Sequence, residues 1–315
     1  MRSTAIRWIF RLFSPLARVD MNLKSLLKNY HSNMALIIGN GINRYKSDSQ
    51  LSSWDAMLLE LWERHTQDEP KDIPLGISLT EFYDALDLSS HSVSKNLQKE
   101  FCAFLDGWQP KAHHLNIMRW AQAYSVPVLT TNFDETLSDS LHLNLQHHNG
   151  VRFTDFYPWS SCFATHDIHS PAGQFAIWHI NGIKRYSRSI RLGLSHYMGS
   201  VERARALIHK GGDKRLYSGK HEGKWNGCNT WLDCIFNNDL VFIGLGLDTS
   251  EIFLRWLLIE RAKYFKTNPQ RKRAAFYLHA GRDLSQGQVI FLKSVGCDII
   301  KLPSYDHLYG DAWTV

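Results

Sequence analysis

A run of polar residues follows a short apolar segment at residues 125–134. The segment SVPVL leads into Thr130, Thr131, Asn132, Phe133 and Asp134 without a glycine or proline between them. A carboxylate in the first turn of a helix is an ordinary feature, but helix capping does not also require an amide two residues before it. Amide and carboxylate side chains can hold a water or a sugar hydroxyl by hydrogen bonds. We therefore treat Asn132 and Asp134 as candidate catalytic residues.

Two glycine pairs follow apolar runs elsewhere in the chain. Gly39-Asn40-Gly41 comes after MALII, and Gly244-Leu245-Gly246 comes after DLVFI. A G-x-G pair after a buried strand lets backbone amides approach a diphosphate closely. The third glycine of the usual fingerprint is absent, so a tight turn without a ligand is the alternative interpretation. The candidate binding residues at these and neighbouring strand ends are Gly39, Asn40, Gly41, Asn43, Thr131, Asn181, Gly244, Gly246 and Asp248.

The segment FAIWHINGIKR at 175–185 contains a candidate acid/base. His179 and Asn181 stand two residues apart, and both side chains face the same way if a strand continues through them. A lone histidine in a strand is usually structural. His179 lies beside an amide and a glycine, and this context favours a role in proton transfer.

Short β-branched apolar runs alternate with helical patterns along the chain. This alternation predicts an α/β fold, Rossmann-like and doubly wound, with a mainly parallel sheet. The nearly continuous apolar runs are typical of strands covered on both faces. Serines at 53 and 250 are suitable N-caps for two of the helices. The predicted strands are 34–39, 126–131, 175–180, 189–194, 239–245, 274–279 and 298–303, and the predicted helices are 52–65, 79–90, 113–124 and 250–265.

We expect one main domain at 31–315, preceded by an N-terminal extension at 1–30. Residues 65–112 contain helical patterns without a convincing strand, which predicts a helical insertion module. The basic, glycine-rich segment 203–226 is interpreted as a solvated excursion, since charge runs usually are. Arg7 and Arg11 interrupt the apolar stretch near the N-terminus, so it predicts neither a signal peptide nor a membrane span. A short amphipathic helix touching a membrane is the alternative there.

Composition excludes several protein classes. The chain has 315 residues, a net charge of +6 and five scattered cysteines without a C-x-x-C pair. This cysteine usage argues for a reducing, cytoplasmic location and against a disulfide scaffold or a four-cysteine zinc site. The histidine pairs His166/His169 and His147/His148 lack a third ligand in the pattern, so no metal site is expected. The mild positive charge permits a phosphate-bearing ligand, but we expect no direct nucleic-acid binding.

The motifs GNGIN (39–43), TTNFD (130–134), HING (179–182) and FIGLGLDTSE (242–251) occur in one order along the chain. Together they resemble the bacterial sirtuin-like domain family, over roughly residues 34 to 310. TTNFD and FIGLGLD are the more specific parts of the resemblance. It implies an NAD-binding domain that cleaves the nicotinamide glycosidic bond, often to deplete NAD during phage infection.

The resemblance also implies roles for particular residues. Asn132 would match the catalytic asparagine, and Asp134 would organise the nicotinamide-ribose pocket. The 39–41 loop would hold the NAD phosphates, and residues 244–248 would lie near the adenosine half. It further implies a homo-oligomer, or a complex with a second defence component such as a P-loop ATPase or translocase.

One position departs from the family pattern. The family places its catalytic histidine directly before the glycine, whereas Asn181 precedes Gly182 here. An amide cannot act as a general base near neutral pH, so the role is either vacant or moved to His179. The sequence therefore leaves open an NAD glycohydrolase with NAD as substrate, a regulatory module that binds NAD or ADP-ribose, and an NAD-dependent protein deacylase. The missing zinc cysteines disfavour the deacylase.

Overall fold

The computed structural model describes residues 22–67, 70–89, 96–147, 158–218 and 224–314. Within them an eight-stranded sheet has the order β3-β4-β5-β2-β1-β6-β7-β8. All neighbouring pairs from β5 to β8 are parallel, while β3 and β4 pair antiparallel at the β5 edge. The strands are β1 (Met34–Ile38), β2 (Val128–Thr130), β3 (Asn144–His147), β4 (Ser161–Ala164), β5 (Ile177–His179), β6 (Asp239–Ile243), β7 (Ala275–Ala280) and β8 (Asp298–Leu302).

The parallel strands follow the order of a dinucleotide-binding fold. Numbered among themselves along the chain, the six parallel strands read 3-2-1-4-5-6 across the sheet, which is the Rossmann order. The direction of winding reverses between β1 and β6. In such sheets ligands bind beyond the carboxyl ends of the strands at this reversal. The predicted Rossmann-like α/β class is confirmed.

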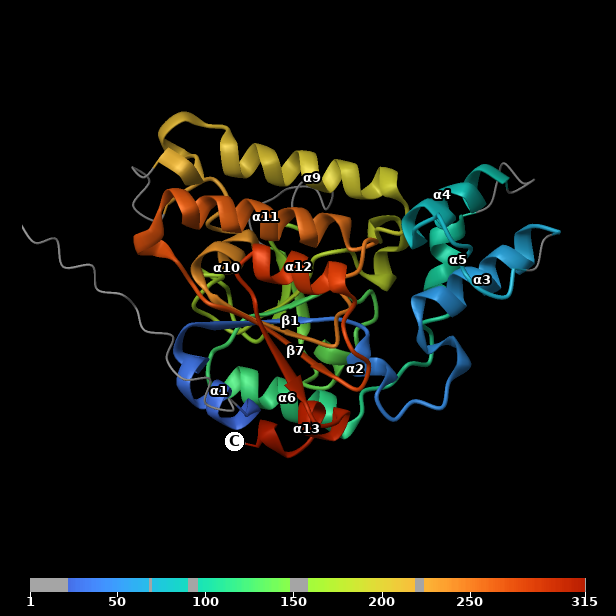
Figure 1. The fold of residues 1–315 in the computed structure, drawn as a ribbon, viewed down its shortest axis with the longest axis horizontal. Coiled ribbons are helices and arrows are strands. Elements are labelled where there is room, and N and C mark those ends of the chain that lie inside the picture. The colour runs from blue at the N-terminus through green and yellow to red at the C-terminus, as the bar shows by residue number, and fades with distance from the viewer. Residues whose placement is uncertain (1–21, 68–69, 90–95, 148–157, 219–223, 315) are drawn as a thin grey trace, which may run out of the picture.

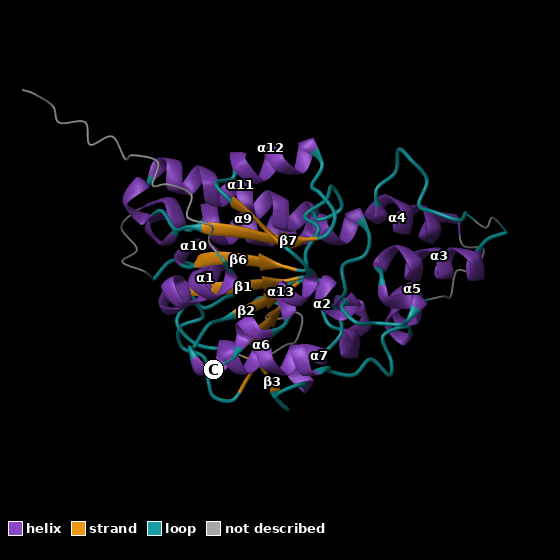
Figure 2. Ribbon diagram, turned by 60° about the horizontal axis from the view of Figure 1, so that its bottom comes forward, coloured by secondary structure: helices purple, strands orange, loops and turns teal. Residues whose placement is uncertain are grey.

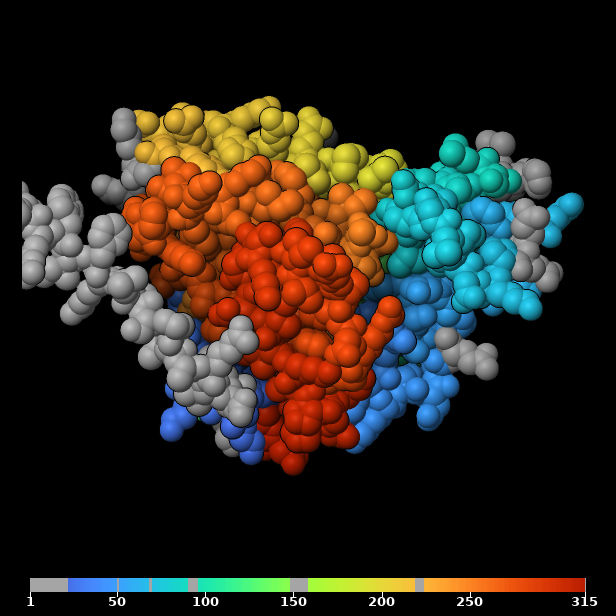
Figure 3. Space-filling model, in the orientation of Figure 1, coloured from blue at the N-terminus to red at the C-terminus, as the bar shows by residue number. Residues whose placement is uncertain are grey.

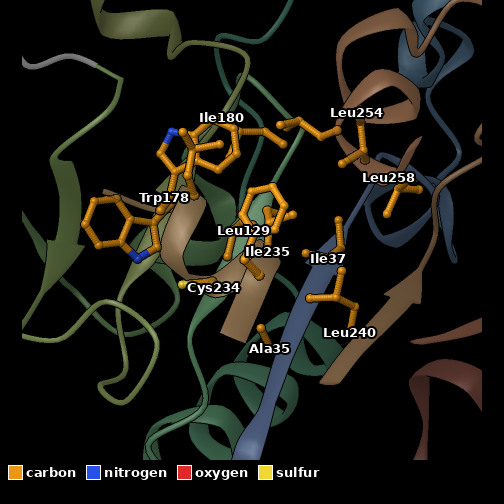
Figure 4. Packing of buried hydrophobic residues seen from close by; sticks show 14 of the residues in the cluster. Ala35, Ile37, Leu129, Trp178, Ile180, Cys234, Ile235, Leu240, Leu254 and Leu258 are labelled. Atoms are coloured by element: carbon orange, nitrogen blue, oxygen red, sulfur yellow. The ribbon is translucent and has the colours of Figure 1, made fainter. Parts of the chain in front are cut away.

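Helices cover both faces of the sheet (Figures 1 and 2). Side chains alternate along the strands, so Ala35 and Ile37 of β1 join one apolar cluster and Leu36 and Ile38 join the other. Figure 4 shows the first cluster, in which Trp178 of β5 lies near Cys234 and Ile37 of β1 lies near Leu258. The helices of that face are α9 (Leu194–His209), α10 (Leu232–Asn237), α11 (Ile252–Thr267) and α12 (Gln286–Ser294), and those of the other face are α1 (Leu23–Tyr30), α6 (Ala112–Ala123) and α13 (Tyr305–Tyr309).

A helical module stands beside the sheet between β1 and β2, and it begins before the expected insertion at 65–112 because it includes the helix at 54–65. It contains α3 (Trp54–His65), α4 (Leu79–Ser89) and α5 (Leu97–Ala103). The Ser53 hydroxyl accepts a hydrogen bond from the Ala56 amide and caps α3. The module has its own apolar cluster, which also takes in Phe133 from the loop after β2. This contact joins the insertion to the strand end that carries the candidate catalytic residues.

Three expectations about the elements need correction. The predicted strand at 189–194 is absent, because Ile190 and Leu192 pack on the helical insertion instead of the sheet. The strands β3 and β4 were not predicted. Part of the expected basic excursion, up to residue 209, belongs to α9, since Ala204 and Ile208 are buried in the core.

The described part of the N-terminal region packs on the main core. Residues 1–21 of the expected extension lie outside the described residues, as do residues 219–223 and His148. Residues 23–30 form α1, whose leucines at 23, 26 and 27 are buried in the main core. Among the described residues, no helix has both the length and the apolar character needed to cross a membrane.

Candidate functional site

A cleft of about 740 Å³ lies at the carboxyl edge of the sheet. One wall comes from the loops that follow β1, β2, β6 and β7, and the other comes from α3, α4 and α5 of the insertion. Figure 3 shows the hollow between the insertion (blue and cyan) and the C-terminal elements (orange and red). Residues of the cleft that the sequence singled out are Asn40, Gly41, Thr131, Asn181, Gly244, Gly246 and Asp248.

The two glycine loops touch each other at the point where the winding reverses. The Gly39 amide donates to the Ile243 carbonyl at 3.0 Å, and the Gly41 amide donates to the Gly244 carbonyl at 2.7 Å. A Cβ atom at Gly39 would lie 2.6 Å from the Gly244 oxygen, a separation that no side chain could adopt without displacing backbone. The glycines are thus required for contact between the loops. The same contact uses two amides that the sequence interpretation assigned to phosphate.

Asn40 lines the cleft, and its side chain is held by two hydrogen bonds. Its Oδ1 accepts a hydrogen bond from Asn43 Nδ2 at 3.0 Å, and its Nδ2 donates to the Ser52 carbonyl at 2.8 Å. Asn43 is buried and does not line the cleft. Of the two asparagines in this loop, the geometry makes Asn40 the one available to a ligand and Asn43 its support.

Asp134 belongs to the same buried network. It accepts hydrogen bonds from Asn43 Nδ2 at 2.8 Å and from the Thr136 amide at 3.1 Å. His114 Nε2 donates to Asn43 Oδ1 at 3.0 Å, and burial lowers the pKa of His114 to about 3, so this histidine is neutral. The Asp134 carboxylate therefore faces the protein interior. It positions the loops after β1 and β2 and does not line the cleft.

Asn132 and His179 lie side by side beneath the cleft. His179 Nδ1 is 2.9 Å from the Asn132 carbonyl oxygen. Because that oxygen can only accept, Nδ1 carries the proton and Nε2 carries the lone pair. Burial lowers the pKa of His179, against an opposing contribution from its hydrogen bond to the Asn132 carbonyl and from the charge of Asp134. The imidazole is thus neutral, as a general base must be.

Several polar atoms in this region have no partner. Among the described residues, no hydrogen bond reaches Thr131 Oγ1, either side-chain atom of Asn132, or His179 Nε2. Asn132 is 0% exposed and His179 is 2% exposed. The residues on either side of Asn132, Thr131 and Phe133, do line the cleft.

Asn181 and His179 do not share a face as the sequence interpretation supposed. β5 ends at His179, and Asn181 lies in a turn before Gly182, whose φ is +108°. Asn181 consequently lines the cleft while His179 stays behind it. The chain direction changes here because Gly182 can adopt a left-handed conformation that other residues avoid.

The loop after β6 connects the sheet to the insertion. Asp248 Oδ1 accepts a hydrogen bond from the Ser250 amide at 2.8 Å, and Ser250 Oγ accepts one from the Leu79 amide at 3.1 Å. Ser250 therefore binds the start of α4, and the expected N-cap role at α11 is wrong. The N-cap position of α11 is occupied by Glu251.

Glu251 and Tyr309 are among the cleft residues that the sequence analysis did not identify. Glu251 is half-buried, and removal from water together with the charge of Asp248 raises its pKa to about 8. Its position just after the second glycine loop was a signal that could have identified it. Tyr309 of α13 also lines the cleft, but it is far from every motif in the sequence and only the folded arrangement identifies it.

The described histidines outside this region form no metal cluster. Across the described parts of the chain, no group of three or more histidine, cysteine, aspartate or glutamate side chains is arranged to hold a metal ion. His166 and His169 lie in the loop after β4.

No protein-family model matches the chain, and no curated protein matches it in sequence.

Proposed function

We propose that the chain binds NAD in this cleft and cleaves the bond between nicotinamide and ribose. In the overall reaction, NAD⁺ and water give nicotinamide, ADP-ribose and a proton. The observation that carries the proposal is the group of unpartnered buried atoms on Thr131, Asn132 and His179, at the carboxyl ends of β2 and β5 beside the cleft.

Buried polar atoms without a hydrogen-bond partner destabilise the folded protein. A buried donor or acceptor without a partner costs about 1–3 kcal/mol, and unpartnered groups in native proteins commonly mark functional positions. A ligand with several hydroxyl groups, such as a ribose, would offset this cost by supplying donors and acceptors. This argument favours a polar substrate at the β2 and β5 ends over an apolar one.

The chemistry suits a neutral base and an amide. Glycosidic cleavage passes through an oxocarbenium-like state, and the departing nicotinamide leaves as a neutral molecule. In the proposal, the Asn132 amide orients the attacking water or a ribose hydroxyl, and His179 Nε2 accepts the proton. Positioned base catalysis of this kind contributes about a hundred- to ten-thousand-fold. Because both side chains are buried, the substrate must displace the Thr131–Phe133 segment to reach them.

The remaining part of the dinucleotide would lie between the two glycine loops. Since the amides of Gly39 and Gly41 are already hydrogen-bonded, we assign diphosphate contact to Asn40 and to the loop at 244–248. Phosphates bind readily to exposed backbone amides at such strand ends.

The biological setting comes from the motif resemblance alone. We propose an NAD-depleting effector of a bacterial anti-phage system, acting in the cytoplasm as a homo-oligomer or beside a second component such as a P-loop ATPase or translocase. Dependence on that partner or on assembly would slow NAD cleavage by the free chain without abolishing it.

A regulatory module that binds NAD or ADP-ribose without cleaving it is the second candidate. Two observations favour it: Asn181 occupies the position before Gly182, and the side chains of Asn132 and His179 do not line the cleft. In this alternative the polar network would only sense the bound dinucleotide.

An assay that follows NAD, nicotinamide and ADP-ribose by chromatography separates the two candidates. The hydrolase proposal expects nicotinamide release that Asn132→Ala abolishes. Asn144→Ala makes the same chemical change at an exposed position on β3 and should leave release intact. Heat of NAD binding in a calorimeter without any product would establish the binding module instead. Undiminished release by Asn132→Ala would remove Asn132 from the mechanism.

A further inference from the structure

Tyr309 places a hydroxyl group at the junction of the two glycine loops. The residue lies at the end of α13, lines the cleft and is 0% exposed. Its hydroxyl oxygen forms no hydrogen bond with any described residue. A phenol hydroxyl is both a donor and an acceptor, and burying it unpartnered is unfavourable.

The surrounding backbone lets this hydroxyl reach the loop junction without using it as a hydrogen-bond donor. A Cβ atom added at Gly244 would lie 2.6 Å from the Tyr309 hydroxyl oxygen, and one added at Gly41 would lie 2.9 Å from it. The absence of side chains at these two glycines is what lets the hydroxyl reach the loop junction. The nearby amides of Gly39 and Gly41 donate to the other loop, so they cannot serve a ligand as well.

Neighbouring rings fix the tyrosine in place. The Tyr305 ring stacks on it with centroids 6.4 Å apart and an interplanar angle of 7°, and the Tyr45 ring packs at 5.0 Å. Burial raises the pKa of Tyr309 well above its usual range. The group is therefore an oriented hydroxyl that keeps its proton at physiological pH.

We propose that the Tyr309 hydroxyl is a phosphate-binding group that donates a hydrogen bond to a diphosphate oxygen of the nucleotide. The inference rests on the proposed function for the identity of the ligand, and it adds a binding residue from α13 that no motif contains. A diphosphate is the fitting ligand because its oxygens are acceptors only, which matches a neutral donor. The carboxyl ends of β1 and β6, where the hydroxyl lies, are also where a Rossmann-like sheet receives the phosphates.

The test compares Tyr309→Phe with the unaltered protein in ADP-ribose binding by calorimetry. Removing a hydrogen bond to a charged acceptor should weaken binding about ten- to a hundredfold. The variant loses only a hydroxyl without a partner, so its resistance to urea should be unchanged or higher. A purely structural tyrosine would not combine weaker binding with undiminished stability.

Tyr264→Phe is the matched control. Tyr264 is also buried, but its hydroxyl accepts a hydrogen bond from Arg271 Nη1 at 2.9 Å and lies outside the cleft. This variant should lose stability and keep its affinity for ADP-ribose. Gly244→Ala provides a second route to the same site, because its methyl group would crowd the hydroxyl, and it should also weaken binding.

The outcomes distinguish this inference from the proposed function. Equal ADP-ribose affinity in Tyr309→Phe and the unaltered protein would overturn the role of Tyr309 and leave the NAD site standing. If the unaltered protein binds neither ADP-ribose nor NAD, the proposed function is overturned and this inference with it.

Discussion

Replacing Asp134 with alanine tests the most densely bonded part of the site. The carboxylate is 1% exposed and accepts hydrogen bonds from Asn43 Nδ2 and from the Thr136 amide. Alanine removes both acceptor oxygens. The Thr136 hydroxyl, which also donates to Asp134, keeps its bond to Asn43 Oδ1, and one N–H of Asn43 keeps its bond to Asn40 Oδ1. Two buried N–H groups, the other N–H of Asn43 Nδ2 and the Thr136 amide, then lack a partner.

The magnitude follows from that count. Each buried donor left without an acceptor costs about 1–3 kcal/mol, so Asp134→Ala should lower the free energy of unfolding by roughly 2–6 kcal/mol. The lower end applies if a water enters the space vacated by the carboxylate. Asn43 also supports Asn40, so affinity for ADP-ribose should fall even under conditions where the variant is fully folded.

Urea denaturation at pH 7 measures the first effect and calorimetry measures the second. Asp298→Ala removes an exposed carboxylate at the start of β8 and should change stability by less than about 0.5 kcal/mol. A free energy of unfolding for Asp134→Ala equal to that of the control would refute the argument that Asp134 holds the two loops together. Loss of NAD cleavage without loss of stability would indicate that Asp134 acts on the substrate directly.

Two further predictions concern the loop after β6. Gly244 has φ +64°, and a Cβ there would lie 3.0 Å from the Ile42 amide nitrogen, so Gly244→Ala should lower the free energy of unfolding by about 1–3 kcal/mol, measured in urea. A methyl group at Gly246 would meet Asp248 Oδ2 at 3.6 Å and the Asp248 amide nitrogen at 4.0 Å, both ordinary contacts, so Gly246→Ala should be clearly less destabilising. Equal destabilisation by the two variants would contradict the close approach of the loops. Folded Glu251 keeps its proton up to its pKa of about 8, whereas the unfolded chain releases it near 4.5. The free energy of unfolding should therefore fall as pH rises from about 5 to about 8. This decline should be smaller in Glu251→Gln. If urea denaturation shows the same pH dependence for both proteins, the Glu251 carboxyl is not desolvated.

Much of the fold could be predicted from local pattern. The apolar runs of β1, β6 and β7 are long and β-branched or aromatic, and strands buried on both faces require such runs. Candidate binding residues lie at the ends of β1, β2 and β6, and the carboxyl ends of parallel strands meet at one edge of a sheet. The structure brings these three ends together.

The errors have a common physical origin in tertiary packing. β3 is four residues long and partly exposed, so it carries no apolar run to reveal it. The segment 189–194 is apolar because it covers the insertion, and a strand pattern cannot be distinguished from such a loop by hydrophobicity alone. In the same way, the buried state of Asn132 and the position of Tyr309 depend on contacts between distant parts of the chain.

Nicotinamide release in a single turnover tests the central claim most directly. With the full chain in excess over NAD at neutral pH, even slow cleavage converts all of the NAD to product, and each protein molecule needs to act only once. We predict stoichiometric nicotinamide and ADP-ribose from the unaltered protein and neither product from Asn132→Ala. NAD that stays intact with the unaltered protein, or equal release by the two proteins, would contradict the account.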